Sequence, residues 1–286
     1  MAPCAAGRLI YKGTAWVEEH RIRGYEVGPD QKTTITTIAN LLQEVAGNQA
    51  VSLWGRTEAG YATDPIMVER NLIFAATRIQ IDMDVYPKWG DMVEVETWFQ
   101  EEGRVAACRN WLVRDPATGR QLGRATSTWV MVNTVKRRLA KIPDEMRVKM
   151  EYMAPHPHRH PFDPTECRLR IPDLEYPPEL VGPVQVARRS DMDMNGHINN
   201  VTYLAWALET VPADVYLNYS LQQVEIDYKS ECMAGQTVES LGSRVVQDTN
   251  GTGILRYVHL LRRCDDSGCH ELVRARTTWR PTYPKF

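Results

Sequence analysis

The feature that most constrains the fold is an internal repeat that spans most of the 286 residues. A six-residue run recurs 150 residues later (129 to 279) with four identities: Arg124-Ala125-Thr126-Ser127-Thr128-Trp129 and Arg274-Ala275-Arg276-Thr277-Thr278-Trp279. Upstream, an Ile-Asp pair, a glycine and a Val-Glu pair recur 145 residues later (90 to 235): Ile81-Asp82, Gly90, Val93-Glu94 and Ile226-Asp227, Gly235, Val238-Glu239. Such self-similarity indicates two copies of one supersecondary unit.

The first copy is expected to contain one long helix and a set of strands. Thr33 or Thr34 caps a helix whose apolar residues recur at helical spacing, and Gly47-Asn48 ends it. Residues 49–70 are interpreted as an excursion over the surface, because glycine and proline interrupt them. We expect strands over residues 11–27, 71–85, 92–100, 105–113 and 121–132, the last four in meander order.

The second copy is expected to repeat this plan, with a helix near residues 199–211 in place of 34–46. Leu41-Leu42-Gln43-Glu44 aligns with Trp206-Ala207-Leu208-Glu209 at a spacing of 165 residues (44 to 209), and the excursion in the first copy explains the different spacing. A long helix wrapped by a curved antiparallel sheet is the hot-dog fold. We therefore predict the α+β class and a tandem (double) hot-dog fold, with two antiparallel sheets each wrapped around a long helix.

The repeat also predicts the domain boundaries. Residues 1–153 form an N-terminal hot-dog domain, 154–178 a proline-rich linker and 179–286 a C-terminal hot-dog domain. His156, His158 and His160 alternate within the linker, so an extended segment places them on one side. Because the linker sequence supplies no further ligand for them, we expect no metal site.

Composition restricts the function classes. With 43% hydrophobic residues and a formal net charge of −2, the chain is not expected to bind nucleic acid. No apolar run approaches the roughly 18 residues of a membrane span, and Met1 to Cys4 are neither a signal nor a transit peptide. The six cysteines form no CxxC pair, which favours a reducing compartment over a disulfide scaffold. Cys264 and Cys269 flank a predicted hairpin turn and are expected to face each other or solvent.

A polar loop that leads into a helix is the candidate site. Asp191-Met192-Asp193-Met194-Asn195-Gly196-His197 gathers carboxylates, a carboxamide and an imidazole around a glycine, and Asn199 or Asn200 can cap the helix that follows. The peptide N–H groups of a helix start favour negative charge, so an anion can develop beside His197. An ordinary helix-capping loop with a surface histidine is the alternative.

The repeat indicates which copy carries the chemistry. In the first copy, Asp30 stands opposite Asn195, Lys32 opposite His197 and Tyr86 opposite Glu231. The first copy therefore lacks the polar set, and its apolar helix is free to line a hydrophobic pocket with residues such as Ile38 and Leu42. The alternative is that these helix residues belong only to the core.

At residues 191–209 and at Glu225-Ile226-Asp227-Tyr228-Lys229-Ser230-Glu231-Cys232, the sequence resembles the plant and algal acyl-acyl-carrier-protein (acyl-ACP) thioesterases. The similarity covers most of the chain. In the first half it includes Arg78, Tyr86-Pro87-Lys88-Trp89-Gly90-Asp91, Trp111-Leu112-Val113-Arg114-Asp115, Trp129-Val130-Met131 and Arg137-Arg138-Leu139-Ala140-Lys141-Ile142-Pro143. The sequence departs from the family at Gly196, where glutamine is usual, and at Ser230, where arginine is usual.

The resemblance implies a double hot-dog enzyme that hydrolyses the thioester of a long-chain acyl-ACP and ends fatty acid synthesis, without metal or organic cofactor. It places the family's catalytic set on Asp193, Asn195, His197 and Glu231. It also implies the chloroplast stroma, with a transit peptide that this sequence does not include. An older proposal for the family makes the neighbouring cysteine, here Cys232, the nucleophile.

The chemistry assigns a role to each residue of the catalytic set. Glu231 is expected to be the general base for a water that His197 positions. Asn195 orients the reactants, and Asp193 fixes its neighbours. Cys232 next to an imidazole is the alternative nucleophile, but adjacent side chains on a strand point to opposite faces, so only one of Glu231 and Cys232 reaches His197 easily.

An acidic carrier protein requires basic residues on its partner. The candidates for docking are Lys136, Arg137, Arg138, Lys141, Arg188 and Arg189, and a solvated charged loop is the alternative. Two rival functions are a double hot-dog hydratase or dehydratase, which does not require Glu231, and a module that binds acyl carrier protein without turnover. A homodimer is one possible assembly.

Overall fold

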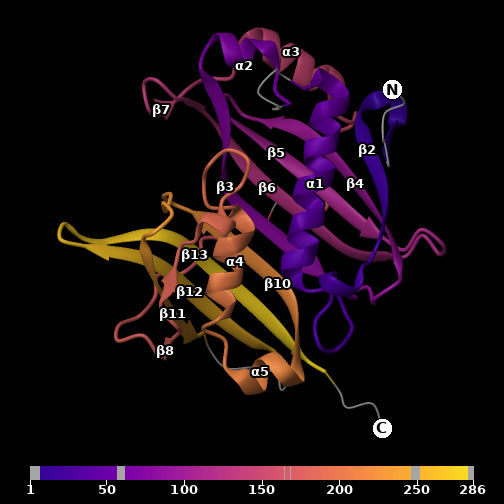
Figure 1. The fold of residues 1–286 in the computed structure, drawn as a ribbon. Coiled ribbons are helices and arrows are strands. Elements are labelled where there is room, and N and C mark those ends of the chain that lie inside the picture. Colours follow the sequence, from indigo (N-terminus) through magenta and orange to yellow (C-terminus); the bar gives the residue numbers. More distant parts are fainter. Residues whose placement is uncertain (1–6, 57–61, 164, 168, 246–251, 283–286) are drawn as a thin grey trace. The chain divides into compact units, whose positions relative to one another are not determined.

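The computed structural model describes residues 7–56, 62–163, 165–167, 169–245 and 252–282, and Figure 1 shows its fold. Met1 to Cys4, considered above for a targeting role, lie outside the described residues. The chain divides into two compact units. Unit 1 comprises Met1–Thr77 and Asp84–Cys167, and unit 2 comprises Arg78–Met83 and Arg168–Phe286.

Unit 1 is an antiparallel sheet with one long helix against it. In order across the sheet, its strands are β1 (Gly7–Ile10), β2 (Ala15–Arg21), β4 (Met92–Glu102), β5 (Ala106–Arg114), β6 (Gln121–Asn133) and the first half of β3 (Leu72–Met83). The short β7 (Arg138–Leu139) pairs with β6. The helix α1 (Ile35–Trp54) lies against β2 and β4 (Figure 1).

The sequence explains why α1 forms and which face it buries. The Thr34 hydroxyl accepts a hydrogen bond from the Thr37 N–H at 3.1 Å and caps the helix. Ile38, Leu42 and Val45 recur at helical spacing and are buried, and burying each stabilises the unit by roughly 1.5–3 kcal/mol. The sheet also holds the helix directly, because Trp111 Nε1 donates to the Leu42 carbonyl at 3.0 Å.

The end of this helix differs from the expectation. The helix continues through Gly47 to Trp54, and Gly55 ends it with φ 71°, a conformation that favours glycine. A glycine inside a helix costs about 1 kcal/mol relative to alanine, but Gln49, two residues later, is buried and accepts a hydrogen bond from Arg109 at 2.5 Å. This tertiary contact outweighs the local preference.

A second apolar core lies under two shorter helices of unit 1, α2 (Pro65–Glu69) and α3 (Asp144–Met153). Its buried members come from these helices, from the sheet and from the segment before α3: Met67, Leu72, Ala107, Met131, Ile142, Met146 and Met150. The segment after α3 packs on the same unit, since Phe162 is 3% exposed and Trp98 Nε1 donates to the Arg159 carbonyl at 3.0 Å.

Unit 2 repeats the plan with a shorter helix. Across its sheet follow residues 78–83 of β3, then β10 (Tyr219–Tyr228), β13 (Gly268–Pro281), β12 (Leu255–Asp265), β11 (Thr237–Arg244) and β8 (Leu180–Val181), with β9 (Gln185–Val186) also paired to β11. The helix α4 (Asn200–Leu208) lies against β11 and β12 (Figure 1). It ends before residue 211 because Pro212 begins the next helix, α5 (Ala213–Asn218).

Strand order confirms the duplication and corrects the expected meander. β3 lies beside β6 rather than β4, and β10 lies beside β13 rather than β11. The vacated edge of β4 pairs with β2, and that of β11 pairs with β8 and β9. The expected single strand over residues 11–27 is likewise interrupted, since β2 ends at Arg21 and a short 3-10 helix (Gly24–Glu26) follows.

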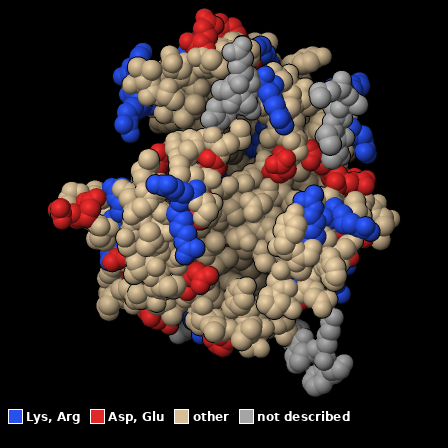
Figure 2. Space-filling model, viewed as in Figure 1, with Lys and Arg blue, Asp and Glu red and all other residues tan. Residues whose placement is uncertain are grey.

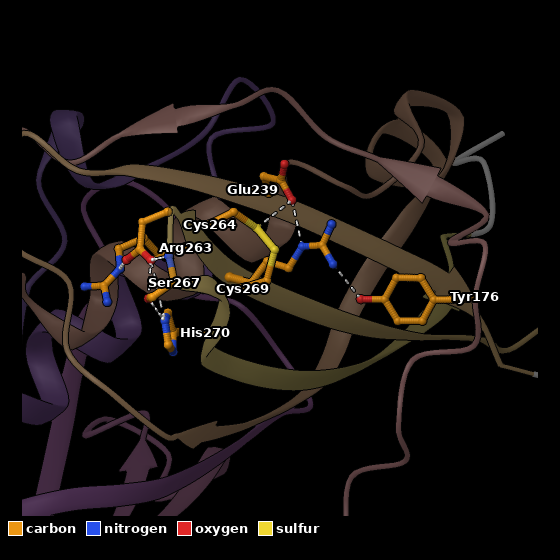
Figure 3. Close-up of a disulfide and its surroundings, with 9 residues drawn as sticks. Tyr176, Glu239, Arg263, Cys264, Ser267, Cys269 and His270 are labelled. Carbon is orange, nitrogen blue, oxygen red and sulfur yellow. Dashed lines mark hydrogen bonds and ion pairs between the residues drawn. A yellow bond between two sulfur atoms is a disulfide. The ribbon is translucent and has the colours of Figure 1, made fainter.

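Cys264 and Cys269 face each other across a hairpin as expected, but they also form a disulfide, which the cysteine spacing did not predict. Cys264 and Cys269 form a disulfide across the β12–β13 hairpin, where they are register partners (Figure 3). The hairpin register brings the two Cα atoms to 4.1 Å, close enough for the side chains to be joined. In the described part of the chain, Cys108, Cys167 and Cys232 are thiols.

Candidate active site

The polar loop of unit 2 forms a closed turn between a short 3-10 helix (Arg189–Asp191) and α4. The Asp193 N–H donates to the His197 carbonyl at 2.7 Å, and the Gly196 N–H donates to the Asp193 carbonyl at 3.0 Å. Gly196 has φ 76°, which a residue without Cβ adopts at little cost. The turn therefore holds residues 193–197 in one conformation immediately before the helix.

Asp193 organises the side chains of this turn. Its Oδ1 accepts from the Asn195 N–H at 2.8 Å and from the His197 N–H at 3.3 Å, and its Oδ2 accepts from Asn195 Nδ2 at 3.2 Å. The carboxamide is thus anchored through its nitrogen, and its oxygen faces away from Asp193 with the capacity to accept another hydrogen bond.

His197 faces Glu231 on the segment that follows β10. Nδ1 of His197 lies 3.7 Å from Oε1 of Glu231, and the two side chains are 47% and 69% exposed. This separation is longer than a direct hydrogen bond, so both groups keep the capacity to bind a third polar atom. The structure therefore brings together the four residues that the resemblance proposed.

The Glu231 segment is anchored on both sides. Before it, the Lys229 N–H donates to the Leu272 carbonyl at 2.9 Å, and the Ser230 hydroxyl donates to the Glu271 carbonyl at 2.6 Å. After it, the Cys232 N–H donates to the Tyr203 hydroxyl at 2.9 Å. An exposed carboxylate thus stands on a backbone that β13 and α4 hold in place.

The start of α4 supplies the expected positive helix end. Asn199 is the cap: its side chain accepts from the Val201 N–H at 2.9 Å, and its carbonyl accepts from the Thr202 N–H at 2.9 Å. Since Asn199 satisfies these two donors, the Asn200 N–H is the candidate for binding an oxyanion.

Cys232 has the environment of a core residue. It is 1% exposed, and its Sγ lies 3.6 Å from the Met233 carbonyl oxygen. Burial raises the pKa of the thiol, and the charge of Arg263 only partly opposes this effect. At neutral pH Cys232 is therefore a protonated thiol, which is a poor nucleophile.

Unit 1 contains the same turn without the carboxylate of Asp193 and the imidazole of His197. The Gly28 N–H donates to the Lys32 carbonyl at 2.8 Å, and Gln31 has φ 62°. These positions correspond to Asp193, His197 and Gly196 at the spacing of 165 residues. Since the backbone forms with Gly28 and Lys32, the fold does not require Asp193 and His197.

Tyr86 occupies the place in unit 1 that corresponds to Glu231, and burial raises the pKa of its hydroxyl. The exposed carboxylate of unit 2 is thus replaced by a partly buried neutral phenol. This difference between the copies is the main structural reason to treat the unit 2 residues as functional.

The other candidate residues are divided between core and surface. Ile38 and Leu42 are each 1% exposed on the buried face of α1. The six docking candidates are all exposed: Lys136, Arg137, Arg138 and Lys141 in unit 1 and Arg188 and Arg189 in unit 2. On the face shown in Figure 2, Lys and Arg side chains are interspersed with Asp and Glu side chains.

Sequence reasoning missed Tyr203 as a member of this site. Tyr203 is 4% exposed and packs edge-on against Trp206 and Tyr228, as a core residue does. A phenol among aliphatic core positions was the available indication, because a buried hydroxyl requires a hydrogen-bond partner.

Comparison with known families finds two matches in tandem. Residues 13–150 match the family model of the acyl-ACP thioesterase N-terminal domain, and residues 183–281 match that of the acyl-ACP thioesterase C-terminal domain. Oleoyl-acyl carrier protein thioesterase 1 of Arabidopsis thaliana is 39% identical over 96% of this chain and 78% of its own length. Palmitoyl-acyl carrier protein thioesterase of Gossypium hirsutum is 36% identical over 99% of this chain and 68% of its own length. Both relatives are described as chloroplastic.

Solved structures give the same result. The 12:0-ACP thioesterase from Umbellularia californica superposes with a TM-score of 0.84 at 33% identity, over 94% of this chain and 95% of that chain. A structure described as a putative oleoyl thioesterase from Lactobacillus plantarum superposes with a TM-score of 0.78 at 24% identity, over 97% of this chain and 100% of that chain. The second match supports the double hot-dog fold alone.

Proposed function

Since the chain belongs to the acyl-ACP thioesterase family and hydrolyses the thioester of acyl-ACP, we propose that Glu231 and His197 activate the attacking water. The reaction releases a free fatty acid and ends chain elongation. The observation that carries the proposal is the His197–Glu231 pair at 3.7 Å, on a turn whose counterpart in unit 1 lacks both groups.

The pair has the properties that water activation requires. A water that hydrogen-bonds to both groups loses a proton to the Glu231 carboxylate while His197 orients it. The water oxygen then bonds to the thioester carbonyl carbon, and the carbon–sulfur bond breaks in the following step. The departing thiolate takes up the proton that Glu231 or His197 holds, which restores the starting state.

The surrounding groups orient the reactants and stabilise the charge. Asp193 holds the Asn195 amide through its nitrogen, so the amide oxygen can accept from the water. The Asn200 N–H, at the positive end of α4, donates to the oxyanion that develops on the carbonyl oxygen. The chemistry needs no metal or organic cofactor.

A thiol-release assay tests the function directly. Purified protein is mixed with oleoyl-ACP, and the free thiol of the carrier protein is followed with a thiol reagent, with Glu231→Gln as the matched isosteric control. We expect release by the wild type and a rate lower by roughly a hundredfold in the variant. Equal release by both proteins would contradict the role of Glu231.

The same assay separates two other functions. A hydratase or dehydratase changes the acyl chain and leaves the thioester intact, and a binding module leaves both intact. The exposed Glu231 beside His197 favours hydrolysis, because neither alternative requires a carboxylate at that position.

We propose that the two units have different roles in the reaction. Domain 1–153 supplies the acyl-chain pocket through residues such as Ile38 and Leu42, residues 154–178 connect the domains, and domain 179–286 supplies the catalytic residues. The relatives named above act on oleoyl-, palmitoyl- and 12:0-acyl carrier protein, and we propose a long-chain substrate for this protein.

The carrier protein is proposed to dock on exposed basic residues. The candidates are Lys136, Arg137, Arg138 and Lys141 on one patch and Arg188 and Arg189 on the other. Because exposed charges act over about 10 Å at 0.1 M salt, docking through them weakens as salt is added. We further propose the plastid stroma as the location, on the description of the relatives, and a homodimer as the assembly. Within the part of the chain that the structure describes, no helix has the length and apolar character to cross a membrane.

A further inference from the structure

Three potential metal ligands lie together at the end of α3, in unit 1. Glu151 is in the last turn of the helix, and His156 and His158 lie on the segment that follows it. Nε2 of His156 is 3.7 Å from Oε1 of Glu151, and Nε2 of His158 is 3.6 Å from Oε2. The ligand atoms of the three residues all lie within 4.8 Å of one another.

From this arrangement we propose that Glu151, His156 and His158 bind a divalent first-row transition metal, with Zn²⁺ as the test ion. Imidazole nitrogens and a carboxylate oxygen are ordinary Zn²⁺ ligands at about 2.0–2.2 Å. Tetrahedral ligands at that distance lie about 3.3–3.6 Å apart, so side-chain rotations close the site, and the metal replaces the contact of His156 Nε2 with the Glu151 carbonyl oxygen at 2.9 Å. Water completes the coordination, because all three residues are exposed.

The sequence pattern alone did not predict this site, because it grouped His156 and His158 with His160 and not with Glu151. The alternation of His156, His158 and His160 predicts three ligands on one side of an extended segment. In the structure His160 lies instead within 3.0 Å of Gln100 Nε2, and Glu151 from the preceding helix takes the third position. The third ligand therefore comes from the last turn of α3 and not from the alternating histidines.

The backbone on both sides of the site is anchored, which favours binding. Upstream, Met146 and Met150 fix α3 in the second apolar core, and Ala154 is fully buried. Downstream, the Arg159 carbonyl accepts from Trp98 Nε1 at 3.0 Å. The three ligands therefore project from backbone segments that are already fixed. Metal binding restricts the motion of little more than their side chains.

The site is distinct from the catalytic residues, which lie in unit 2. A bound ion would tie the end of α3 to residues 156–158 and stabilise unit 1, because it binds the folded chain. The chemistry selects borderline metals over Mg²⁺, which prefers oxygen ligands and octahedral geometry.

The experiment measures metal binding to the full chain by equilibrium dialysis and isothermal titration calorimetry. Zn²⁺ is the probe and Mg²⁺ the comparison ion. The variants are Glu151→Gln, His156→Ala and His158→Ala. The matched control is His270→Ala, which removes an exposed histidine whose Nε2 lies 3.7 Å from the Asp265 carboxylate.

We expect one Zn²⁺ per chain, affinity lower by at least about tenfold in each ligand variant, and unchanged affinity in the control. Thioester hydrolysis by each variant verifies that it is folded. Wild-type binding no tighter than that of Glu151→Gln, or equal loss in His270→Ala, would overturn the proposal.

Co²⁺ spectroscopy provides a second measurement that does not depend on the variants. A site of two imidazoles and a carboxylate gives ligand-field bands without the sulfur-to-metal charge-transfer band that cysteine ligands produce. A strong charge-transfer band would assign the bound ion to a free cysteine and overturn the proposal.

Discussion

The Tyr203 hydroxyl accepts a hydrogen bond from the backbone N–H of Cys232 at 2.9 Å, which joins α4 to the segment that carries Glu231. The same helix starts at Asn199, two residues after His197. Both members of the proposed catalytic pair, His197 and Glu231, are thus positioned by contacts with one helix. Burial raises the pKa of Tyr203 to about 12, so its hydroxyl is protonated and keeps this role at neutral pH.

Tyr203→Phe is expected to lower kcat by roughly ten- to a hundredfold while KM changes little, because a small displacement of Glu231 misplaces the water. Stability should fall by about 1–3 kcal/mol, since the Cys232 N–H loses its partner. Steady-state kinetics and urea unfolding measure the two effects. The control is Tyr216→Phe on α5, where the residue is 55% exposed, and it should change neither kcat nor stability. A change in KM alone would show that Tyr203 does not position the pair.

Comparison of substitutions at His197, Glu231 and Cys232 identifies the nucleophile. If water attacks, Glu231→Ala and His197→Ala should each lower turnover by roughly a hundredfold or more, and Cys232→Ala should keep most of it. An alkylating reagent should inactivate the protein slowly at neutral pH, because the pKa of the Cys232 thiol is raised. Loss in Cys232→Ala equal to that in His197→Ala would establish the thiol as the nucleophile.

Much of the fold could be predicted because the repeat and the strand alternation are local patterns. Strand β6 was expected at 121–132 and is found at Gln121–Asn133. The repeated tryptophans also have equivalent contacts: Trp129 Nε1 donates to Ser127 at 2.7 Å, and Trp279 Nε1 donates to Thr277 at 2.9 Å. Identical residues in the two copies therefore make equivalent interactions.

The errors arise where a distant contact overrides a local pattern. The helix α1 continues past Gly47 because Gln49 accepts a hydrogen bond from Arg109 of the sheet. β3 lies beside β6 and not beside β4, because β2 pairs with that edge of β4. For the site, the residue types and spacing pointed to the polar loop of residues 191–197, and the family resemblance proposed Asp193, Asn195 and His197 within it. They could not show that Tyr203 contacts the Glu231 segment or that Glu151 joins two histidines, since these contacts depend on tertiary packing.

The acyl pocket is tested by changing the size of buried residues on α1. Ile38→Ala and Leu42→Ala each create space in the core of unit 1, at a cost of about 2–5 kcal/mol in stability. We expect a shift in the chain lengths of the fatty acids that the protein releases, with thioester hydrolysis retained. Gas chromatography of the free fatty acids from a bacterial host measures the profile. Unchanged profiles in folded variants would assign these residues to the core alone.

The Cys264–Cys269 disulfide is expected to contribute little to activity and modestly to stability. It closes a loop with a sequence separation of 5, and loop-entropy estimates give about 2 kcal/mol for so short a loop. Figure 3 shows Glu239, Arg263 and His270 around it, on the hairpin and the neighbouring strand β11. The double variant Cys264→Ser/Cys269→Ser should unfold at lower urea concentration and hydrolyse acyl-ACP at a similar rate. A large loss of activity would show that the disulfide holds β13 in the position that anchors Ser230.

The last prediction concerns the dependence of stability on pH. His259 is 2% exposed and lies between two hydroxyls, Thr210 at 2.7 Å from Nδ1 and Thr277 at 2.8 Å from Nε2. The Thr210 hydroxyl donates to the Ala207 carbonyl at 2.8 Å, so Nδ1 of the ring is the donor to Thr210. Thr277 can then donate to Nε2, and the neutral imidazole is fully satisfied.

Burial lowers the pKa of His259 from 6.5 to about 4. Between these values the unfolded chain binds a proton that the folded chain excludes. Stability from this group is therefore complete above pH 6.5 and is lost as the pH falls towards about 4, by about 3 kcal/mol in total. Urea unfolding at pH 7 and pH 4.5 measures the loss. Because carboxylates also titrate in this range, the comparison is with His259→Gln, whose loss should be smaller by about 2–3 kcal/mol. The exposed His270→Gln serves as the control and should behave like the wild type, and an equal loss in His259→Gln and the wild type would contradict the prediction.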